Sequence, residues 1–191
     1  GVDALATAYR TIKADGNLIQ AVGRNWLGGT ILDMIDVSEP DAPYKIASHG
    51  LNGMDSFSID PQPGMAIGVG NQLTLFDTSD PGQIVRRGFL DIPPATSGSR
   101  VGDYFYSFGW GEGLDVWNIA NPDAPRAAGH SAIDGFAGRY ATKLGNGTLL
   151  LQTDTDLIHT LDISKAAAPK RTATAWLPGG VDARDIAMYR G

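Results

Sequence analysis

The 191-residue chain contains no cysteine. It can therefore form no disulfide, offer no thiolate nucleophile and supply no cysteine ligand to zinc. Because proteins of the cytosol and of a bacterial envelope can both lack disulfides, this absence leaves the redox compartment open.

Clustered positive charge and long apolar runs are also missing. The formal net charge is −6, and a protein that neutralises many phosphates shows grouped Lys and Arg, so nucleic acid is not an expected partner. No apolar run approaches the roughly 18 residues that span a bilayer, and we expect no membrane span. Gly1 opens no signal-peptide pattern, so any targeting segment is expected to be absent or already removed.

One short phrase occurs four times along the chain. Its first copy runs from Leu32 through Asp36 to Pro40, an apolar segment followed by a turn-like Asp-Val-Ser-Glu-Pro. The anchor residues of the four copies lie 41, 41 and 44 residues apart and are Asp36, Asp77, Asn118 and Asp162. This period is that of one four-stranded β-propeller blade per repeat.

Each phrase is the third strand of its predicted repeat. A second apolar run precedes it, opened by one of the turn signals Asp15-Gly16, Pro63-Gly64, Gly102-Asp103 and Asn146-Gly147. A polar segment follows it, preceded in three repeats by proline, as in Pro43 before residues 44–48, and is expected to be an outer strand. Weaker patterns predict innermost strands at residues 4–12, 56–60, 96–101 and 139–144.

Apolar residues occupy both faces of the predicted third strands. Leu73 and Leu75 share one face in the second repeat, and Phe76 lies on the other. Such a sheet is expected to be covered on both sides, as neighbouring blades cover each other. The Asp or Asn anchors are interpreted as turn-formers that cap nearby backbone amides rather than as ligands.

These patterns predict an all-β fold, a β-propeller in a single domain over residues 1–191. We expect four-stranded blades at about residues 1–50, 51–92, 93–135 and 136–178. Residues 179–191 would be a partial blade, because residues 180–190 echo residues 1–10. The favoured interpretation is a piece of a larger propeller; the alternative is four blades that close alone and leave the last strand redundant.

The phrase resembles the LVIVD-repeat family, whose blades follow the pattern Leu-x-hydrophobic-hydrophobic-Asp-Val-Ser-x-Pro with a second proline soon after. Residues 183–187 also look like the innermost-strand motif of that family, and the last phrase departs from the pattern by carrying Ala166 in place of the first proline. The resemblance implies a β-propeller of bacterial or archaeal origin that is exported to the periplasm, the cell surface or the medium. It implies no assigned catalytic residues.

Two glycine-rich loops are candidate binding surfaces. Residues 24–29 present Arg24 and Trp26, and residues 109–113 present Trp110 and Glu112. Aromatic side chains beside charged ones are typical anchors at binding surfaces, including carbohydrate sites. The alternative is that both tryptophans fill space between blades.

Metal-site patterns are sparse. Of the three histidines, His49 and His130 are expected at similar places after their outer strands, which favours equivalent surface or strand-end positions over a metal site. None of the three, His159 included, has a histidine partner at ligand spacing. Asp154 and Asp156 are weak calcium candidates because carboxylate oxygens suit that ion. No other cofactor is expected.

The sequence favours a non-enzymatic scaffold that binds a protein partner or forms part of a surface or envelope assembly. It contains neither a phosphate-binding P-loop nor a nucleophile elbow. The alternative is a propeller hydrolase or oxidoreductase with an axial carboxylate or calcium site. Its candidate residues are Asp55, Asp182 and Asp185, which lie near the starts of predicted innermost strands.

Overall fold

The computed structural model describes residues 8–24, 29–50, 56–109, 113–133, 138–145, 147–153 and 157–176. Their regular structure is entirely β, in four antiparallel sheets of four strands each, and each sheet is a meander in chain order. No helix in these ranges is long and apolar enough to cross a membrane.

The four sheets have matching strand lengths. Sheet 1 comprises β1 (Ala8–Asp15), β2 (Leu18–Arg24), β3 (Thr30–Asp36) and β4 (Tyr44–Gly50). Sheet 2 comprises β5 (Ser56–Gln62), β6 (Met65–Gly70), β7 (Gln72–Asp77) and β8 (Val85–Asp91). Sheet 3 comprises β9 (Ala95–Val101), β10 (Tyr104–Gly109), β11 (Leu114–Asn118) and β12 (Arg126–Ser131). Sheet 4 comprises β13 (Gly138–Gly145), β14 (Thr148–Thr153), β15 (Leu157–Asp162) and β16 (Lys170–Trp176).

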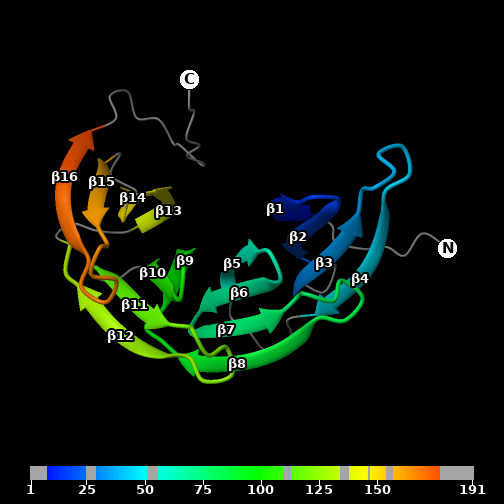
Figure 1. Ribbon diagram of the computed structural model, residues 1–191, viewed down its shortest axis with the longest axis horizontal. Coiled ribbons are helices and arrows are strands. Elements are labelled where there is room, and N and C mark those ends of the chain that lie inside the picture. The colour runs from blue at the N-terminus through cyan, green and yellow to red at the C-terminus, as the bar shows by residue number, and fades with distance from the viewer. Residues whose placement is uncertain are drawn as a thin grey trace.

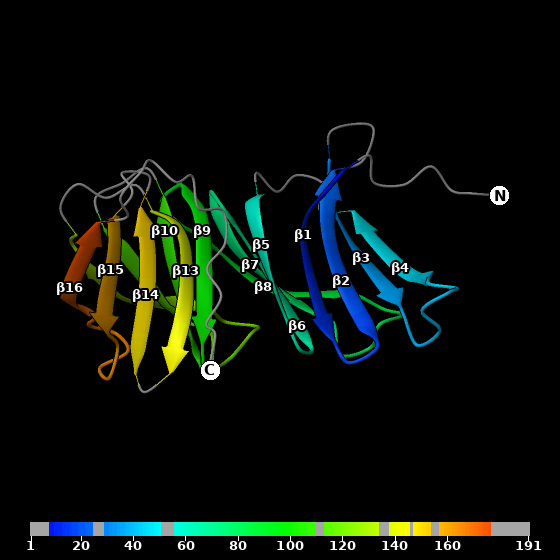
Figure 2. The same ribbon diagram turned by 90° about the horizontal axis from the view of Figure 1, so that it is seen from above.

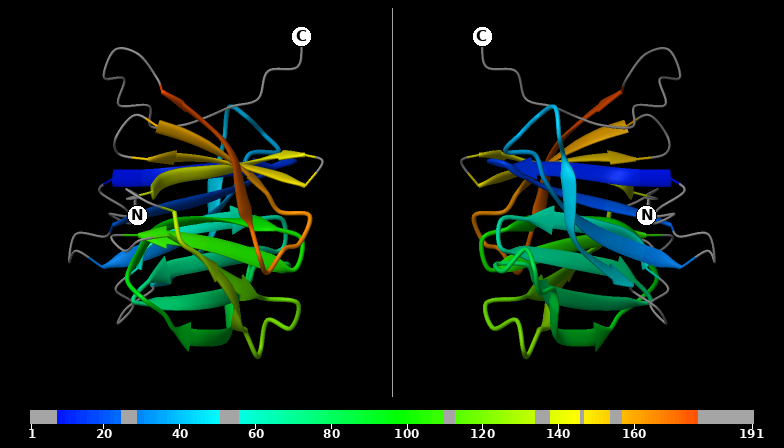
Figure 3. Two further views of the ribbon diagram at one scale, coloured as in Figure 1. Left: turned by 90° about the vertical axis from the view of Figure 1, so that its left-hand side faces the viewer. Right: turned by 90° about the vertical axis from the view of Figure 1, so that its right-hand side faces the viewer.

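The sheets follow one another around an open arc, with sheets 1 and 4 at its two ends (Figure 1). The first strands β1, β5, β9 and β13 line the inside of the arc and contact one another in that order. The last strands β4, β8, β12 and β16 lie on the outside, and Figure 3 shows β16 foremost from one side and β4 from the other. The sequence therefore predicted the four-sheet, four-strand organisation, whereas the β-propeller architecture stays a prediction.

Glycine closes the hairpin between the first two strands of every sheet. The four equivalent glycines have positive φ angles of 58°, 68°, 60° and 72° and are Gly16, Gly64, Gly102 and Gly147. Such angles are strained for any residue with a Cβ atom, so glycine is the residue these tight turns require. The predicted turn signals are confirmed at these hairpins.

The anchor of each phrase ends the third strand with a side-chain turn. The side-chain oxygen of Asp36 accepts a hydrogen bond from the backbone N–H of Ser38 at 2.6 Å. The same bond recurs in the other three sheets at 3.0, 3.1 and 2.8 Å, from Ser79 to Asp77, Ala120 to Asn118 and Ser164 to Asp162. The capping role predicted for the anchors is confirmed.

The outer strands differ from the inner ones in burial and in register. Every residue of β16 is exposed, and β8 buries only Gly88. Each outer strand pairs with the third strand through a register shift at one equivalent place, for example between Met34 and Ile35 on β3. A bulge of this kind increases the twist and bends the strand, so each outer strand curves away from its neighbours.

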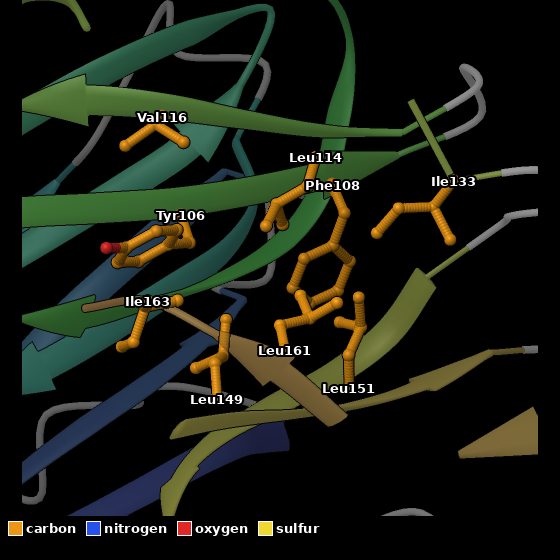
Figure 4. Packing of buried hydrophobic residues seen from close by; sticks show 9 residues of the cluster. All are labelled: Tyr106, Phe108, Leu114, Val116, Ile133, Leu149, Leu151, Leu161 and Ile163. Atoms are coloured by element: carbon orange, nitrogen blue, oxygen red, sulfur yellow. The ribbon is translucent and has the colours of Figure 1, made fainter. Parts of the chain in front are cut away.

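The core consists of three apolar clusters between consecutive sheets. We name the face that a sheet turns towards the next sheet its leading face, and the opposite face its trailing face. Leading-face Leu32 and Met34 of sheet 1 cluster with trailing-face Phe76 of sheet 2. The other two joints repeat this arrangement, and Figure 4 shows the one between sheets 3 and 4, where Val116 and Tyr106 lie opposite Leu149, Leu161 and Ile163. Burial on both faces, as the phrase predicted, comes from sheet-on-sheet packing.

Strand boundaries agree with the sequence-based expectations to within a few residues. The innermost strands of sheets 2, 3 and 4 lie where they were predicted, whereas β1 extends to Asp15, beyond the predicted limit at Ile12. The partial blade predicted at residues 179–191 lies outside the described residues.

Candidate functional site

The predicted binding loops connect the second and third strands of their sheets. Figure 2 shows β2 and β14, the second strands of the first and last sheets, pointing towards the same edge of the arc. We call this the loop edge; β2 ends there at Arg24, and β14 ends there at Thr153. The opposite edge holds the hairpin glycines and the anchor turns.

Arg24 is the one predicted binding residue that the structure describes. It lies exposed at the end of β2 and pairs with Thr30 at the start of β3. The remaining binding and calcium candidates, together with the axial carboxylates, lie outside the described residues: Trp26, Trp110, Glu112, Asp154, Asp156, Asp55, Asp182 and Asp185.

A row of polar residues lies next to the loop edge, on the third strands. The second position of each phrase is polar in all four copies, although apolar residues flank it in the first three: Asp33, Thr74, Asp115 and His159. All four point towards the trailing faces of their sheets, because they are two residues from Ile35, Phe76, Trp117 and Leu161. The row was not predicted from the sequence, although a polar residue at one fixed place in an apolar phrase was a signal for it.

In sheet 1 the row holds a fully buried carboxylate. Asp33 has no exposed surface and accepts hydrogen bonds from the hydroxyl of Tyr9, at 2.7 Å, and from that of Ser48. Ser48 is its register partner on β4. Partial burial, the hydrogen bond to Asp33 and the charge of that carboxylate raise the pKa of Tyr9 to about 12, so Tyr9 stays a donor at neutral pH.

In sheet 3 the row holds a carboxylate and an imidazole. His130 lies opposite Asp115 in the β11–β12 register, and its Nδ1 is 2.8 Å from Oδ1 of Asp115. The His130 side chain is 55% exposed. Gly113, which begins the segment into β11, lies so close that an added Cβ would be 3.1 Å from Nε2 of His130. The imidazole therefore supports the base of the loop that carries Trp110 and Glu112.

A buried hydrogen bond reinforces the same sheet. The indole Nε1 of Trp117 donates to the hydroxyl of Ser107 at 2.7 Å, and Ser107 is the register partner of Asp115 on β10. Because Trp117 and Ser107 are both buried, this bond satisfies a donor that water cannot reach. It fixes the aromatic side chain that sheet 3 turns towards sheet 2.

In sheet 4 the residue of the polar row is a buried histidine, His159. His159 is 2% exposed, and its Nδ1 lies 2.8 Å from the hydroxyl of Thr174, its register partner on β16. Burial, together with the charge of Arg171, lowers the pKa of His159 below its usual value. The imidazole is therefore neutral at neutral pH.

Sheet 2 is the exception. Thr74 is fully buried, and its hydroxyl has no hydrogen-bond partner among the described residues. Its register partner is Phe89, a half-exposed aromatic whose ring lies 4.4 Å below the guanidinium carbon of Arg86. A cation–π contact on the surface replaces the polar pair here.

The predicted similarity of two histidines holds in part. His49 lies within β4 and His130 within β12, not after these strands, and each is the penultimate residue of its strand. His49 pairs with Leu32 and His130 with Asp115, one register step apart, so the two imidazoles point to opposite faces of their sheets. Among the described residues no group of three or more His, Asp or Glu side chains is placed to hold a metal ion.

The side chains of the polar row are placed to position the nearby loops rather than to exchange protons with a substrate. Asp33 and His159 are enclosed by their partners, and the imidazole of His130 packs against the loop base at Gly113. Cross-strand pairs of this kind hold the third and fourth strands in register immediately below the loop edge. Comparison of the sequence with protein-family models and with curated proteins finds no match.

Proposed function

We propose that this chain is a β-propeller array that acts as a non-enzymatic binding scaffold, exported from the cytoplasm, with a protein as its partner. One observation carries the proposal: four equivalent sheets bring their strand 2 to strand 3 connections to one edge. The polar row stiffens three of the four sheets directly beneath that edge.

The order of the sheets supports the propeller part of the proposal. Each joint packs the leading face of one sheet on the trailing face of the next, and the first strands lie inside the arc. This is the radial repetition by which propellers cover both faces of every blade. Further blades would extend the arc by the same contact.

The loops at this edge support the binding part. Residues 25–28 and 110–112 contain Trp26, Trp110 and Glu112, and exposed Arg24 adjoins the first segment. Tryptophan and arginine dominate the energetics of protein interfaces, because they bury a large area around a polar group. In many proteins the binding residues lie on loops, and a rigid scaffold of sheets holds these loops in place. Export rests on the resemblance of the phrase to the LVIVD-repeat family.

The test compares partner capture by three proteins. Immobilised wild-type chain, the Trp26→Ala/Trp110→Ala double variant and the matched control Phe89→Ala are exposed to an extract of the source cells, and bound proteins are identified by mass spectrometry. Phe89 is an exposed aromatic on the outer strand β8, at the height of the polar row but on the outside of the arc and on a different sheet from both tryptophan segments. We expect a partner that the wild type and the control retain and the double variant loses.

Purified partner then gives the affinities of the three proteins. A loss of binding of about tenfold or more in the double variant, with unchanged thermal unfolding, supports the proposal. Equal binding by all three proteins would refute it. Unfolding of the double variant alone would show that the tryptophans belong to the core.

A further inference from the structure

The two ends of the arc leave one face of sheet 1 and one face of sheet 4 incompletely covered. On trailing faces, the positions of Phe76, Trp117 and Leu161 are buried in sheets 2, 3 and 4, but the equivalent Ile35 in sheet 1 is half-buried. On leading faces, Met34, Leu75 and Val116 are fully buried in sheets 1, 2 and 3, but the equivalent Thr160 in sheet 4 is half-buried.

Neighbouring positions show the same contrast. Ile19 on the trailing face of sheet 1 is half-buried, whereas the equivalent Ala66, Phe105 and Leu149 are fully buried. Leu150 and Ile158 on the leading face of sheet 4 are also half-buried. Each end therefore exposes apolar side chains at positions that are core positions elsewhere in the chain.

The two open faces are complementary. Every joint within the chain packs a leading face on a trailing face. Sheet 4 offers a leading face that is open at Leu150, Ile158 and Thr160. Sheet 1 offers a trailing face that is open at Ile19 and Ile35, beside the enclosed Asp33. A single chain thus carries both halves of one more joint of the same kind, at opposite ends of the arc (Figure 1).

We propose that a second copy of this chain covers both open faces, so that two four-sheet arcs close head to tail into one eight-sheet ring. The proposal rests on the propeller architecture proposed above and names the partner of its open ends. Sheet 4 of each copy packs on sheet 1 of the other, which gives two identical joints related by a two-fold axis and leaves no free face. Eight blades lie within the range of known propellers.

The outer strands supply a second element of the joint. At the joints between sheets 2 and 3 and between sheets 3 and 4, Gly88 and Gly129 lie directly against the turn of the following sheet, at Pro122 and Ala167 respectively. The equivalent residue is alanine in the other two sheets: Ala47 in sheet 1 packs against the cluster between sheets 1 and 2, and Ala173 in sheet 4 is exposed. The closing joint would therefore resemble the joint between sheets 1 and 2, which carries alanine at this place, rather than the two joints that carry glycine.

Charge favours the same pairing. At the joint between sheets 2 and 3, Arg87 forms two hydrogen bonds of 2.7 Å to Asp123 in the turn of sheet 3. The equivalent turn of sheet 1 carries exposed Asp41. Exposed Lys170 begins β16 of sheet 4 opposite Asp162, on the leading side, whereas Arg171 lies opposite Leu161 on the trailing side. The closing joint thus brings a lysine to an acidic turn.

The test measures the mass of the native 191-residue protein by light scattering. We expect about twice the chain mass of 20.2 kDa for the wild type. Ile35→Glu places a charge on the open trailing face, and Thr160→Lys places one on the open leading face. Each variant is expected to halve the mass, because a buried unpaired charge opposes association. Val85→Glu, at an exposed position on β8 of sheet 2, is the matched control and should keep the wild-type mass.

Mixing the two variants tests the head-to-tail geometry. The positions of Thr160 and Ile35 correspond to Val116 and Leu161, which belong to one cluster at the joint between sheets 3 and 4. A mixed dimer has one joint that pairs Lys with Glu and one joint of wild-type residues. The mixture should therefore regain the doubled mass that neither variant has alone.

Three outcomes would overturn the proposal. A monomeric wild type would show that a second copy does not cover the open faces, whether they stay open or are covered by further blades of a longer chain. A dimer that persists in both variants would place the interface elsewhere. Failure of two folded monomeric variants to pair on mixing would refute the head-to-tail arrangement. Loop-edge binding is measured separately by the tryptophan variants, so a monomer that still binds its partner would overturn this proposal alone.

Discussion

Sheets 1 and 2 carry the same phrase in different surroundings. Phe76 on the trailing face of sheet 2 is 1% exposed because sheet 1 covers it, whereas the equivalent Ile35 is half-buried at the end of the arc. Both residues are large and apolar, and both lie on a third strand at the same register. The difference shows that the neighbouring sheet, and not the phrase, determines how deeply such a position is buried.

The first prediction compares the loss of stability when a side chain is removed from a joint between two sheets with the loss when one is removed from the end of the arc. Phe76→Ala removes a buried ring from the cluster between sheets 1 and 2 and should lower the free energy of unfolding by about 3–5 kcal/mol, because it leaves a cavity. Ile35→Ala removes a half-buried side chain and should cost only about 1 kcal/mol. Urea unfolding of both variants, at a concentration where the chain is monomeric, measures the difference. Equal losses would mean that the end face is covered within one chain.

The second prediction concerns the close contact of outer strands with the next sheet. A Cβ added to Gly129 would overlap the carbonyl oxygen of Ala167 in sheet 4. Gly129→Ala should therefore destabilise the protein by about 1–3 kcal/mol through overpacking. Ala173→Val, at the equivalent position on the open end, should change stability by less than about 0.5 kcal/mol. Thermal unfolding of the two variants, measured as monomers, tests this prediction. An unchanged stability of the Gly129→Ala variant would show that the joint can widen.

The features predicted from the sequence are those with local causes. Hairpin glycines such as Gly16, the anchor turn at Asp36 and the apolar strands are each specified within a few neighbouring residues. The features that escaped prediction depend on cross-strand register or on a neighbouring sheet. The pairing of Asp115 with His130 requires the register of β11 and β12, including its bulge, and the close contact at Gly129 requires the position of sheet 4.

The candidate site was therefore predicted less well than the fold. The glycine-rich composition of the segment at residues 109–113 identified a loop, but not what supports it. The support came from a side chain 17 positions beyond Gly113 in sequence, His130, whose role is visible only when β12 folds back beside β11. The sequence did contain a signal, a polar residue at the same place in all four phrases. This signal indicates a shared structural position and does not by itself indicate a chemical role.

The smallest expected effect is a pH dependence of stability that depends on His159 but not on its neighbour Thr160. These two adjacent residues of sheet 4 point to opposite faces of the sheet. His159 lies on the buried trailing face, and Thr160 lies on the open leading face. Because burial and Arg171 lower the pKa of folded His159 below 6.5, the unfolded chain binds more protons in this range. This contribution to stability is complete above about pH 6.5. It is lost as the pH falls towards the folded pKa, and it changes no further below that.

His159→Thr, which installs the residue that sheet 2 carries at Thr74, should remove this part of the pH dependence. Thr160→Ser, on the open face, should leave it intact. Urea unfolding of the wild type and both variants between pH 7.5 and about pH 5 measures the slopes. A wild-type slope that survives in the His159→Thr variant would assign the titration to another group. A slope that disappears only in the His159→Thr variant would show that the titrating group is the histidine on the covered face of sheet 4, and that its neighbour on the open face makes no contribution.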